Sequence, residues 1–168
     1  RVLFRSPKER EVVAFHEVGH ALVAAMLKGT DPVHKITIVP RTMGALGYTM
    51  QVPEEEKFLT SREDLMNQIT VMLGGRSAEE EVFNLVSTGA SNDIERATSA
   101  ARSMISMYGM SERFDMMALE SIQNRYLDGR AVRNCSEQTS TVLDEETLNV
   151  IKAAHSKARQ ILRDRKSR

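Results

Sequence analysis

The sequence predicts a mainly α-helical domain that carries one small β-hairpin. Four long segments show apolar residues at helical spacing, and only one short stretch is rich in β-branched residues. Apolar residues make up 41% of the chain and charged residues 27%, which is typical of a globular protein. At 168 residues the chain is long enough to bury a core of its own. We therefore expect one domain over residues 1–168.

The first helix is predicted over residues 7–28. Ser6 has the features of an N-cap, Pro7 suits the first helical position, and Glu9 would complete a capping box. Apolar residues then recur at helical spacing up to Gly29, which favours a left-handed terminus. This segment is the clearest helix in the sequence.

A short hairpin is predicted next. Residues 33–40 contain a β-branched run, and residues 46–52 alternate between apolar and polar side chains. Gly44 and Gly47 indicate a turn between the two strands. A second helix is then expected to begin near Ser61 and to reach about Phe83. The glycine pair at 74–75 is the place where this helix could break.

The remaining chain predicts two further helices. Asn92 and Glu95 resemble a capping box, and the helix that they would open ends at Gly109. Residues 110–141 show no clear period, and a last helix is expected over 144–165. The predicted apolar faces of the two helices include Ile94, Ala97, Ala101, Met104, Ile105, Tyr108, Leu148, Ile151, Ala154, Ala158, Ile161 and Leu162.

Charge and composition exclude several classes of function. The 23 basic residues balance the 23 acidic ones, so no net field attracts nucleic acid, and we expect no nucleic-acid partner. The apolar run at residues 21–27 is far shorter than the roughly 20 residues that cross a bilayer, so we expect no membrane segment and a soluble domain. The single cysteine, Cys135, cannot form an internal disulfide and is expected to be an exposed bystander.

One motif indicates metal chemistry. His16 and His20 are four residues apart in the first predicted helix, so both imidazoles would lie on one face and could bind one cation. Glu17 follows His16 directly and would hold a water molecule at that cation. This H-E-x-x-H arrangement is typical of zinc peptidases, in which zinc polarises a carbonyl and the glutamate takes a proton from water.

A catalytic zinc site needs a third protein ligand, and the residues alone leave the choice open. One alternative is a glutamate from the following helix, where Glu79, Glu80 and Glu81 stand together. The other is Asp93, just after a glycine-containing loop. A third histidine at the spacing H-x-x-G-x-x-H is absent, which excludes the metzincin pattern.

Four blocks of sequence extend the motif in a fixed order. They are residues 15–21 (FHEVGHA), 31–41 (DPVHKITIVPR), 73–80 (LGGRSAEE) and 87–98 (STGASNDIERAT). In this order they resemble the FtsH family of membrane-anchored, ATP-dependent metalloproteases. The resemblance covers residues from about 8 to 112 and returns in the last helix; it is loose between 113 and 140.

The resemblance implies the roles of the site residues. Asp93 matches the aspartate that is the third zinc ligand in the family, beside His16 and His20. Glu17 would be the general base, and Glu79 would orient a ligand histidine through its other ring nitrogen. One zinc ion per chain is implied. The strand around residues 46–49 would lie beside the zinc and accept an extended substrate by edge pairing.

The resemblance also implies a larger assembly. The chain would be the zinc metallopeptidase domain of a membrane-anchored AAA+ protease, without its transmembrane and ATPase parts, since it holds no G-x-x-x-x-G-K-[ST] loop. An ATPase in cis would deliver unfolded or damaged proteins, the full-length protein would be a homo-hexamer, and it would act at the cytoplasmic face of the inner membrane.

Two other functions remain open at this point. A catalytically silent oligomerisation domain with a structural metal would need a fourth protein ligand that closes the coordination sphere. A small-molecule metallohydrolase would need a deep pocket in place of an open cleft.

Overall fold

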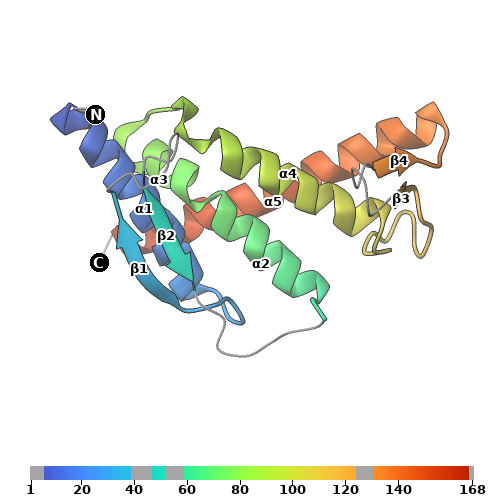
Figure 1. Ribbon diagram of the computed structural model, residues 1–168, viewed down its shortest axis with the longest axis horizontal. Helices are drawn as coiled ribbons and strands as arrows, with labels where there is room; N and C mark the ends of the chain where they lie inside the picture. The colour runs from blue at the N-terminus through green and yellow to red at the C-terminus, as the bar shows by residue number, and fades with distance from the viewer. Residues whose placement is uncertain (1–5, 39–46, 52–58, 124–130, 167–168) are drawn as a thin grey trace.

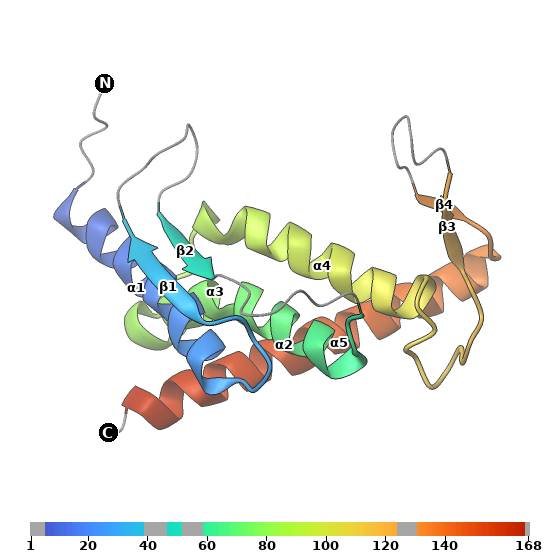
Figure 2. The same ribbon diagram turned by 60° about the horizontal axis from the view of Figure 1, so that its bottom comes forward.

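The computed structural model describes residues 6–38, 47–51, 59–123 and 131–166. It confirms the mainly α-helical class, with five α-helices and two small antiparallel sheets in this part of the chain. The two sheets lie at opposite ends of the molecule, and the last helix, α5 (Glu137–Lys166), runs between those ends (Figures 1 and 2). No described helix combines the length and the apolar character that crossing a bilayer requires.

Helix α1 (Pro7–Met26) begins where the sequence predicts. The Ser6 hydroxyl accepts a hydrogen bond from the Glu9 backbone N–H, and the Glu9 carboxylate accepts one from the Ser6 N–H, so the capping box is confirmed. The helix ends two residues earlier than predicted, with Leu27 extended. Gly29 has the expected left-handed backbone, with φ of 75°, but it lies beyond the cap, in the following turn.

The predicted hairpin is present beside α1. Strands β1 (Val33–Thr37) and β2 (Tyr48–Gln51) pair antiparallel, with Ile36 opposite Thr49, and the register shifts between Val33 and Lys35. The hairpin packs on α1 (Figures 1 and 2). The predicted turn at Gly44 lies outside the described residues, as do residues 39, 40, 46 and 52 of the predicted strands.

The second predicted helix is in fact two helices. Helix α2 (Arg62–Met72) and helix α3 (Gly74–Phe83) are separated at Leu73. The glycine pair explains the break, because α3 starts in close contact with α1. A Cβ atom on Gly74 would lie 2.9 Å from the carbonyl oxygen of Gly19, and one on Gly19 would lie 2.6 Å from that of Gly74. Only glycine at both positions permits this approach.

Helix α4 (Ser91–Ser106) corrects the prediction for its start. A 3-10 turn, η1 (Thr88–Ala90), leads directly into it, so Ala90 occupies the cap position without a side-chain hydrogen bond. Asn92 and Glu95 therefore lie inside the helix, and the capping box predicted for them is wrong. The turn is started by Ser87, whose hydroxyl accepts a hydrogen bond from the Gly89 N–H.

The segment predicted as irregular holds a second hairpin. Strands β3 (Glu120–Ile122) and β4 (Ala131–Arg133) pair antiparallel near the start of α5. Helix α5 begins at Glu137, seven residues before the predicted position, after the Ser136 hydroxyl accepts a hydrogen bond from the Thr139 N–H. Cys135 is half-buried against the core, so the prediction that it is exposed is wrong.

Two apolar clusters form the core, and α5 contributes residues to both. The first lies between α2, α4 and α5, and the second between α1, α2, α3 and α5. Their buried members are mostly small or β-branched, which lets the helices approach closely. The first comprises Ile69, Leu73, Ala97, Ala101, Met104, Ile105, Leu119, Leu143 and Ala154; the second comprises Val23, Ala24, Val71, Ala78, Ala158 and Leu162.

Three residues predicted on buried helix faces are exposed. Ile94 lies in the first turn of α4, Tyr108 lies after its last turn, and Leu148 lies on the outer side of α5. The apolar period of these helices therefore extends beyond the length over which neighbouring helices cover them.

Candidate active site

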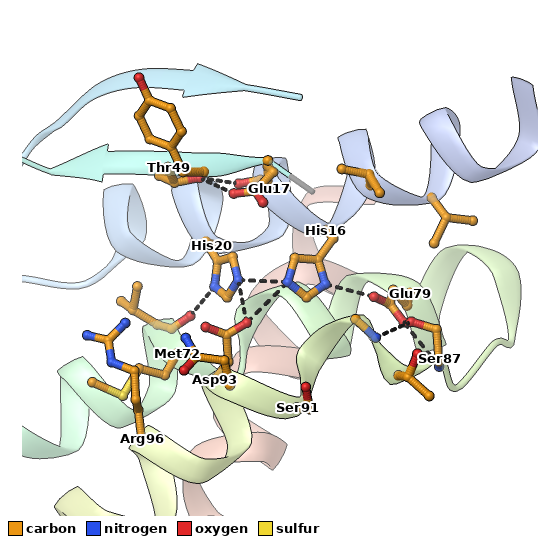
Figure 3. Close-up of a pocket in the computed structure, with 18 of the residues that line it drawn as sticks. His16, Glu17, His20, Thr49, Met72, Glu79, Ser87, Ser91, Asp93 and Arg96 are labelled. Carbon is orange, nitrogen blue, oxygen red and sulfur yellow. Dashed lines mark hydrogen bonds and ion pairs between the residues drawn. The ribbon is translucent and has the colours of Figure 1, made fainter. Parts of the chain in front are cut away.

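The two motif histidines converge as predicted on one face of α1. The Nε2 atoms of His16 and His20 are 3.0 Å apart, and their rings meet edge to face at an angle of 79° (Figure 3). The one-turn spacing brings both side chains to the same side, where α3 packs and the first turn of α4 presents Asp93. His16 is buried, and His20 is half-buried.

Asp93 completes a triangle with the two imidazoles. It reaches them from the first turn of α4, and its Oδ2 atom lies 3.2 Å from Nε2 of His16 and 3.4 Å from Nε2 of His20. Among the described residues, these three side chains form the one group of histidine, cysteine and carboxylate groups whose ligand atoms all lie within 4.8 Å of each other.

The partners of the two Nδ1 atoms determine which nitrogen of each imidazole carries the hydrogen. Nδ1 of His16 lies 2.7 Å from Oε1 of Glu79, and Nδ1 of His20 lies 2.7 Å from the carbonyl oxygen of Val71. Both partners only accept hydrogen bonds, so each Nδ1 must carry the hydrogen. In the neutral rings both Nε2 atoms then present lone pairs. Three electron-pair donors thus face one another with no hydrogen between them.

This donor set fits a small divalent cation. Three lone-pair donors at such short range repel one another unless a positive charge lies among them. Zinc binds histidine nitrogen and carboxylate oxygen at about 2.0–2.2 Å in tetrahedral geometry, so neighbouring ligand atoms are separated by about 3.3–3.5 Å. The observed separations of 3.0, 3.2 and 3.4 Å are close to that value.

The directions of the pKa shifts of His16 and Asp93 agree with this fit. Burial disfavours the charged form of His16, but hydrogen bonds to Asp93 and Glu79 and their negative charges outweigh it and raise its pKa above 6.5. Burial likewise disfavours the Asp93 carboxylate, yet the hydrogen bonds and positive charge that His16 and His20 supply when protonated outweigh it and lower its pKa. The site therefore favours a positive charge among these three groups.

Glu79 is buried behind His16 and is itself held by a loop. It is 1% exposed, and its Oε2 atom accepts hydrogen bonds from the Ser87 hydroxyl at 2.8 Å and from the Ser87 N–H at 3.3 Å. Arg76 donates to the Ser87 carbonyl oxygen and fixes the same loop. These contacts orient the carboxylate that faces Nδ1 of His16.

Neighbouring glutamates on α3 face away from the histidines. Glu80 lies 3.1 Å from Nε2 of His155, and Glu81 accepts hydrogen bonds from Arg159 and Arg163, all on α5. Of the carboxylates that the sequence left open as a third ligand, Asp93 alone reaches the Nε2 atoms in the described structure, whereas Glu79 reaches Nδ1.

Glu17 lies on the strand side of the two imidazoles (Figure 3). It is 7% exposed, and Thr49 of β2 contacts both its backbone carbonyl oxygen, at 2.9 Å, and its Oε2 atom, at 3.1 Å. The hairpin therefore contributes directly to the surroundings of the motif. The family resemblance implies that residues 46–49 lie beside the metal, but it does not indicate the contact between Thr49 and Glu17.

Gly75 brings the backbone of α3 against both imidazoles. A Cβ atom at this position would lie 2.5 Å from Nε2 of His16 and 2.6 Å from Nε2 of His20, closer than real Cβ atoms approach. Sequence reasoning treated this glycine only as a possible helix break. Its close approach to the two imidazoles depends on how α3 packs on α1.

The site opens into a long cleft of about 1510 Å³. The cleft runs from the N-terminus of α1 past the histidines to the start of α2. Residues of β2 line one side, and the first turn of α4 lines the other. Pockets for small ligands usually have about 300–1000 Å³, so this space suits an extended chain.

Comparisons with known proteins agree with this geometry. The profile of peptidase family M41 matches residues 3–168. The chain is 73% identical over 157 residues to a Clostridium perfringens protein named ATP-dependent zinc metalloprotease FtsH, covering 94% of this chain and 22% of that protein. Proteins of the same name from Lancefieldella parvula and Thermotoga maritima are 49% and 44% identical, with 95% and 94% of this chain and 25% and 26% of theirs covered. The chain thus spans about a quarter of the length of these curated relatives.

Proposed function

Because the chain belongs to peptidase family M41, we propose that residues 1–168 are the zinc endopeptidase domain of a longer ATP-dependent protease. The observation that carries the proposal is the convergence of three lone-pair donors, from two helices, beside a buried glutamate. Relatives at 73% and 49% identity are named zinc metalloproteases, which supports zinc as the cation here.

His16, His20 and Asp93 would hold one zinc ion per chain. Their three ligand atoms leave a fourth position for water or substrate, as catalytic zinc sites require. Bound zinc would supply Lewis acidity, which activates water and polarises the scissile carbonyl. Glu79 and the Val71 carbonyl oxygen would hold the two Nδ1 hydrogens, so both rings keep the orientation and tautomer that ligation requires.

Glu17 would be the general base. A carboxylate next to a ligand histidine can accept the proton of the attacking water and then donate it to the leaving amine. Its burial between α1 and β2 restricts it to a small set of positions. The chain's own residues thus orient the ligands, hold the base and move one proton.

The cleft supports unfolded polypeptide as the substrate. Its volume exceeds what a small molecule needs, and β2 lines it with an edge that no other described strand pairs with. An extended substrate could pair with this edge through main-chain hydrogen bonds, which carry little sequence information. We therefore propose broad specificity for unfolded or damaged proteins.

The names of the relatives support an ATPase partner in the same polypeptide. We propose that this AAA+ module unfolds substrates and delivers them to the cleft, within a homo-hexamer at the cytoplasmic face of the inner membrane. Neither nucleic acid nor a membrane segment has a part in the function proposed for residues 1–168.

The two alternative functions are less well supported. A structural metal would be closed by a fourth protein ligand, and the ligand group among the described residues has three members. A small-molecule hydrolase would need an enclosed pocket, whereas the site lies in a long cleft.

Metal removal tests the proposed function. The zinc-loaded chain is expected to cleave unfolded casein and short fluorogenic peptides, to lose this activity on treatment with 1,10-phenanthroline, and to regain it with zinc. Zinc-loaded protein that cleaves neither substrate, or activity that survives complete metal removal, would contradict the proposal.

A pair of variants tests the ligand set. Asp93→Ala is expected to lower zinc content strongly, because it removes a ligand atom. Glu79→Ala should lower zinc affinity about 10- to 100-fold, because it removes only the support of His16. Zinc titration of the two purified variants gives the order, and the reverse order would make Glu79 the ligand.

A further inference from the structure

We propose that Thr49 is a positioning residue for the general base, and that β2 thereby holds the Glu17 carboxylate in place. The inference rests on the proposed peptidase function and concerns a residue that the H-E-x-x-H motif does not contain. Thr49 lies 32 positions along the chain from Glu17, and the hairpin brings them together.

The contacts of one hydroxyl group carry the proposal. Thr49 Oγ1 is 3.1 Å from Oε2 of Glu17 and 2.9 Å from the backbone carbonyl oxygen of the same residue. A hydroxyl has one hydrogen to donate and can also accept, and its hydrogen rotates to suit the partner. A bond to a carboxylate is stronger than one to a neutral carbonyl, so Oε2 is the preferred acceptor while Glu17 is ionised.

The same hydroxyl can also hold Glu17 after the proton has moved. When the other oxygen, Oε1, takes up the proton, Oε2 remains a hydrogen-bond acceptor, so the Thr49 hydroxyl can continue to donate to it. The heavy atoms need not move between the two states. Thr49 therefore keeps the base in one position throughout proton uptake and release, which reduces reorganisation during the reaction.

Gly47, the residue before β2, also restricts the Glu17 carboxylate. A Cβ atom on Gly47 would lie 2.8 Å from Oε1 and 2.9 Å from Cγ of Glu17, so the backbone at Gly47 is in close contact with the side chain. The Thr49 hydroxyl thus contacts Oε2, and the space beside Oε1 is open only because residue 47 has no side chain. Glu17 is consequently fixed by β2 and the residue before it, as well as by its own helix.

In this arrangement one strand, β2, would position both the substrate and the general base. Tyr48 and Thr49 line the cleft, and β2 is the strand proposed to pair with substrate. A polypeptide aligned on β2 would be aligned on the same strand that holds Glu17. The distance between the base and the scissile bond then depends in part on β2, and small errors in such distances cost large factors in rate.

Replacement of the hydroxyl tests the proposal. Thr49→Val keeps the shape and removes the hydrogen bond, and it is expected to lower kcat for a fluorogenic peptide about tenfold or more while KM and zinc content stay within about twofold. Thr49→Ser restores the hydroxyl and should recover most of kcat. The matched control is Thr98→Val on the exposed side of α4, which also removes a hydroxyl-to-carbonyl bond and should leave kcat unchanged.

Three results would overturn the inference. They are a wild-type kcat in Thr49→Val, an equal loss in Thr49→Ser, or a loss of zinc in Thr49→Val that matches its loss of activity. Failure of the proposed function is separate, since it would appear as absence of zinc-dependent cleavage in the wild-type chain itself.

Discussion

Replacing Glu17 with glutamine is expected to abolish peptide cleavage and to leave zinc bound. The amide has the size of the carboxylate but cannot take a proton from water, and general-base catalysis contributes about 10²- to 10⁴-fold in rate. The three ligand atoms belong to other residues and keep their supports, so zinc affinity should stay within about twofold of wild type. Casein cleavage and zinc content, measured on the same sample, check both parts.

Glu11→Gln is the matched control, because Glu11 is an exposed acid on the same helix. It removes the same charge from α1 and should leave cleavage unchanged. Normal cleavage by Glu17→Gln would show that another group is the base. Loss of zinc in that variant would mean that the carboxylate is needed for binding rather than for chemistry.

Replacing Gly75 with alanine is expected to weaken zinc binding at least about tenfold and to reduce cleavage in parallel. The new methyl carbon would lie 2.5 and 2.6 Å from the two Nε2 atoms, about 0.8–0.9 Å short of ordinary van der Waals contact, so both imidazoles must shift. Metal sites tolerate errors of only about 0.5 Å. Zinc titration of the purified variant, with cleavage measured at saturating zinc, checks the prediction.

The variant at the adjacent position, Gly74→Ala, is expected to lower the stability of the fold rather than to displace the imidazoles. Its Cβ atom would lie 2.9 Å from the Gly19 carbonyl oxygen, so it would push the backbones of α1 and α3 apart. Overpacking of this kind costs about 1–3 kcal/mol of stability. Urea unfolding of the metal-free proteins should therefore show the larger loss in Gly74→Ala. Wild-type zinc affinity in Gly75→Ala would contradict the steric reasoning.

The elements that the sequence predicts well are those with strong local signals. Ser6 and Glu9 cap α1 through bonds within three residues, and the His16–His20 spacing follows from helix geometry. The hairpin is also local, and its β-branched run is distinctive. Such features depend on neighbours in the sequence, so no knowledge of the tertiary structure is needed to infer them.

Other elements were missed because their signals are short or compete with one another. The capping pattern at Asn92 is a valid local signal, but the turn started by Ser87 extends the helix back to Ser91. Strands β3 and β4 have three residues each, which is too short for a period to be seen. The start of α5 does have a signal, in the Ser136 and Thr139 pair, that the prediction overlooked.

The candidate site combines local and distant contributions. His16, Glu17 and His20 follow from one motif, whereas the choice between Glu79 and Asp93 depends on how α3 packs on α1 and on which side chain the first turn of α4 presents to His16. The residues alone leave that choice open, and only the family resemblance indicated Asp93. The contacts of Thr49 and Gly75 are tertiary and have no signature of their own in the sequence.

The three adjacent glutamates of α3 have a consequence for the far end of the chain. Like charges this close repel one another, and here each has a basic partner: Glu79 faces His16, while Glu80 and Glu81 face basic side chains of α5 and share Arg159. Those basic side chains lie within 12 residues of the C-terminal end of the helix. Removing those basic side chains would leave two carboxylates without countercharges, one turn or less from Glu79, which contacts Nδ1 of His16. The last turns of α5 therefore help to hold the segment of α3 that supports His16.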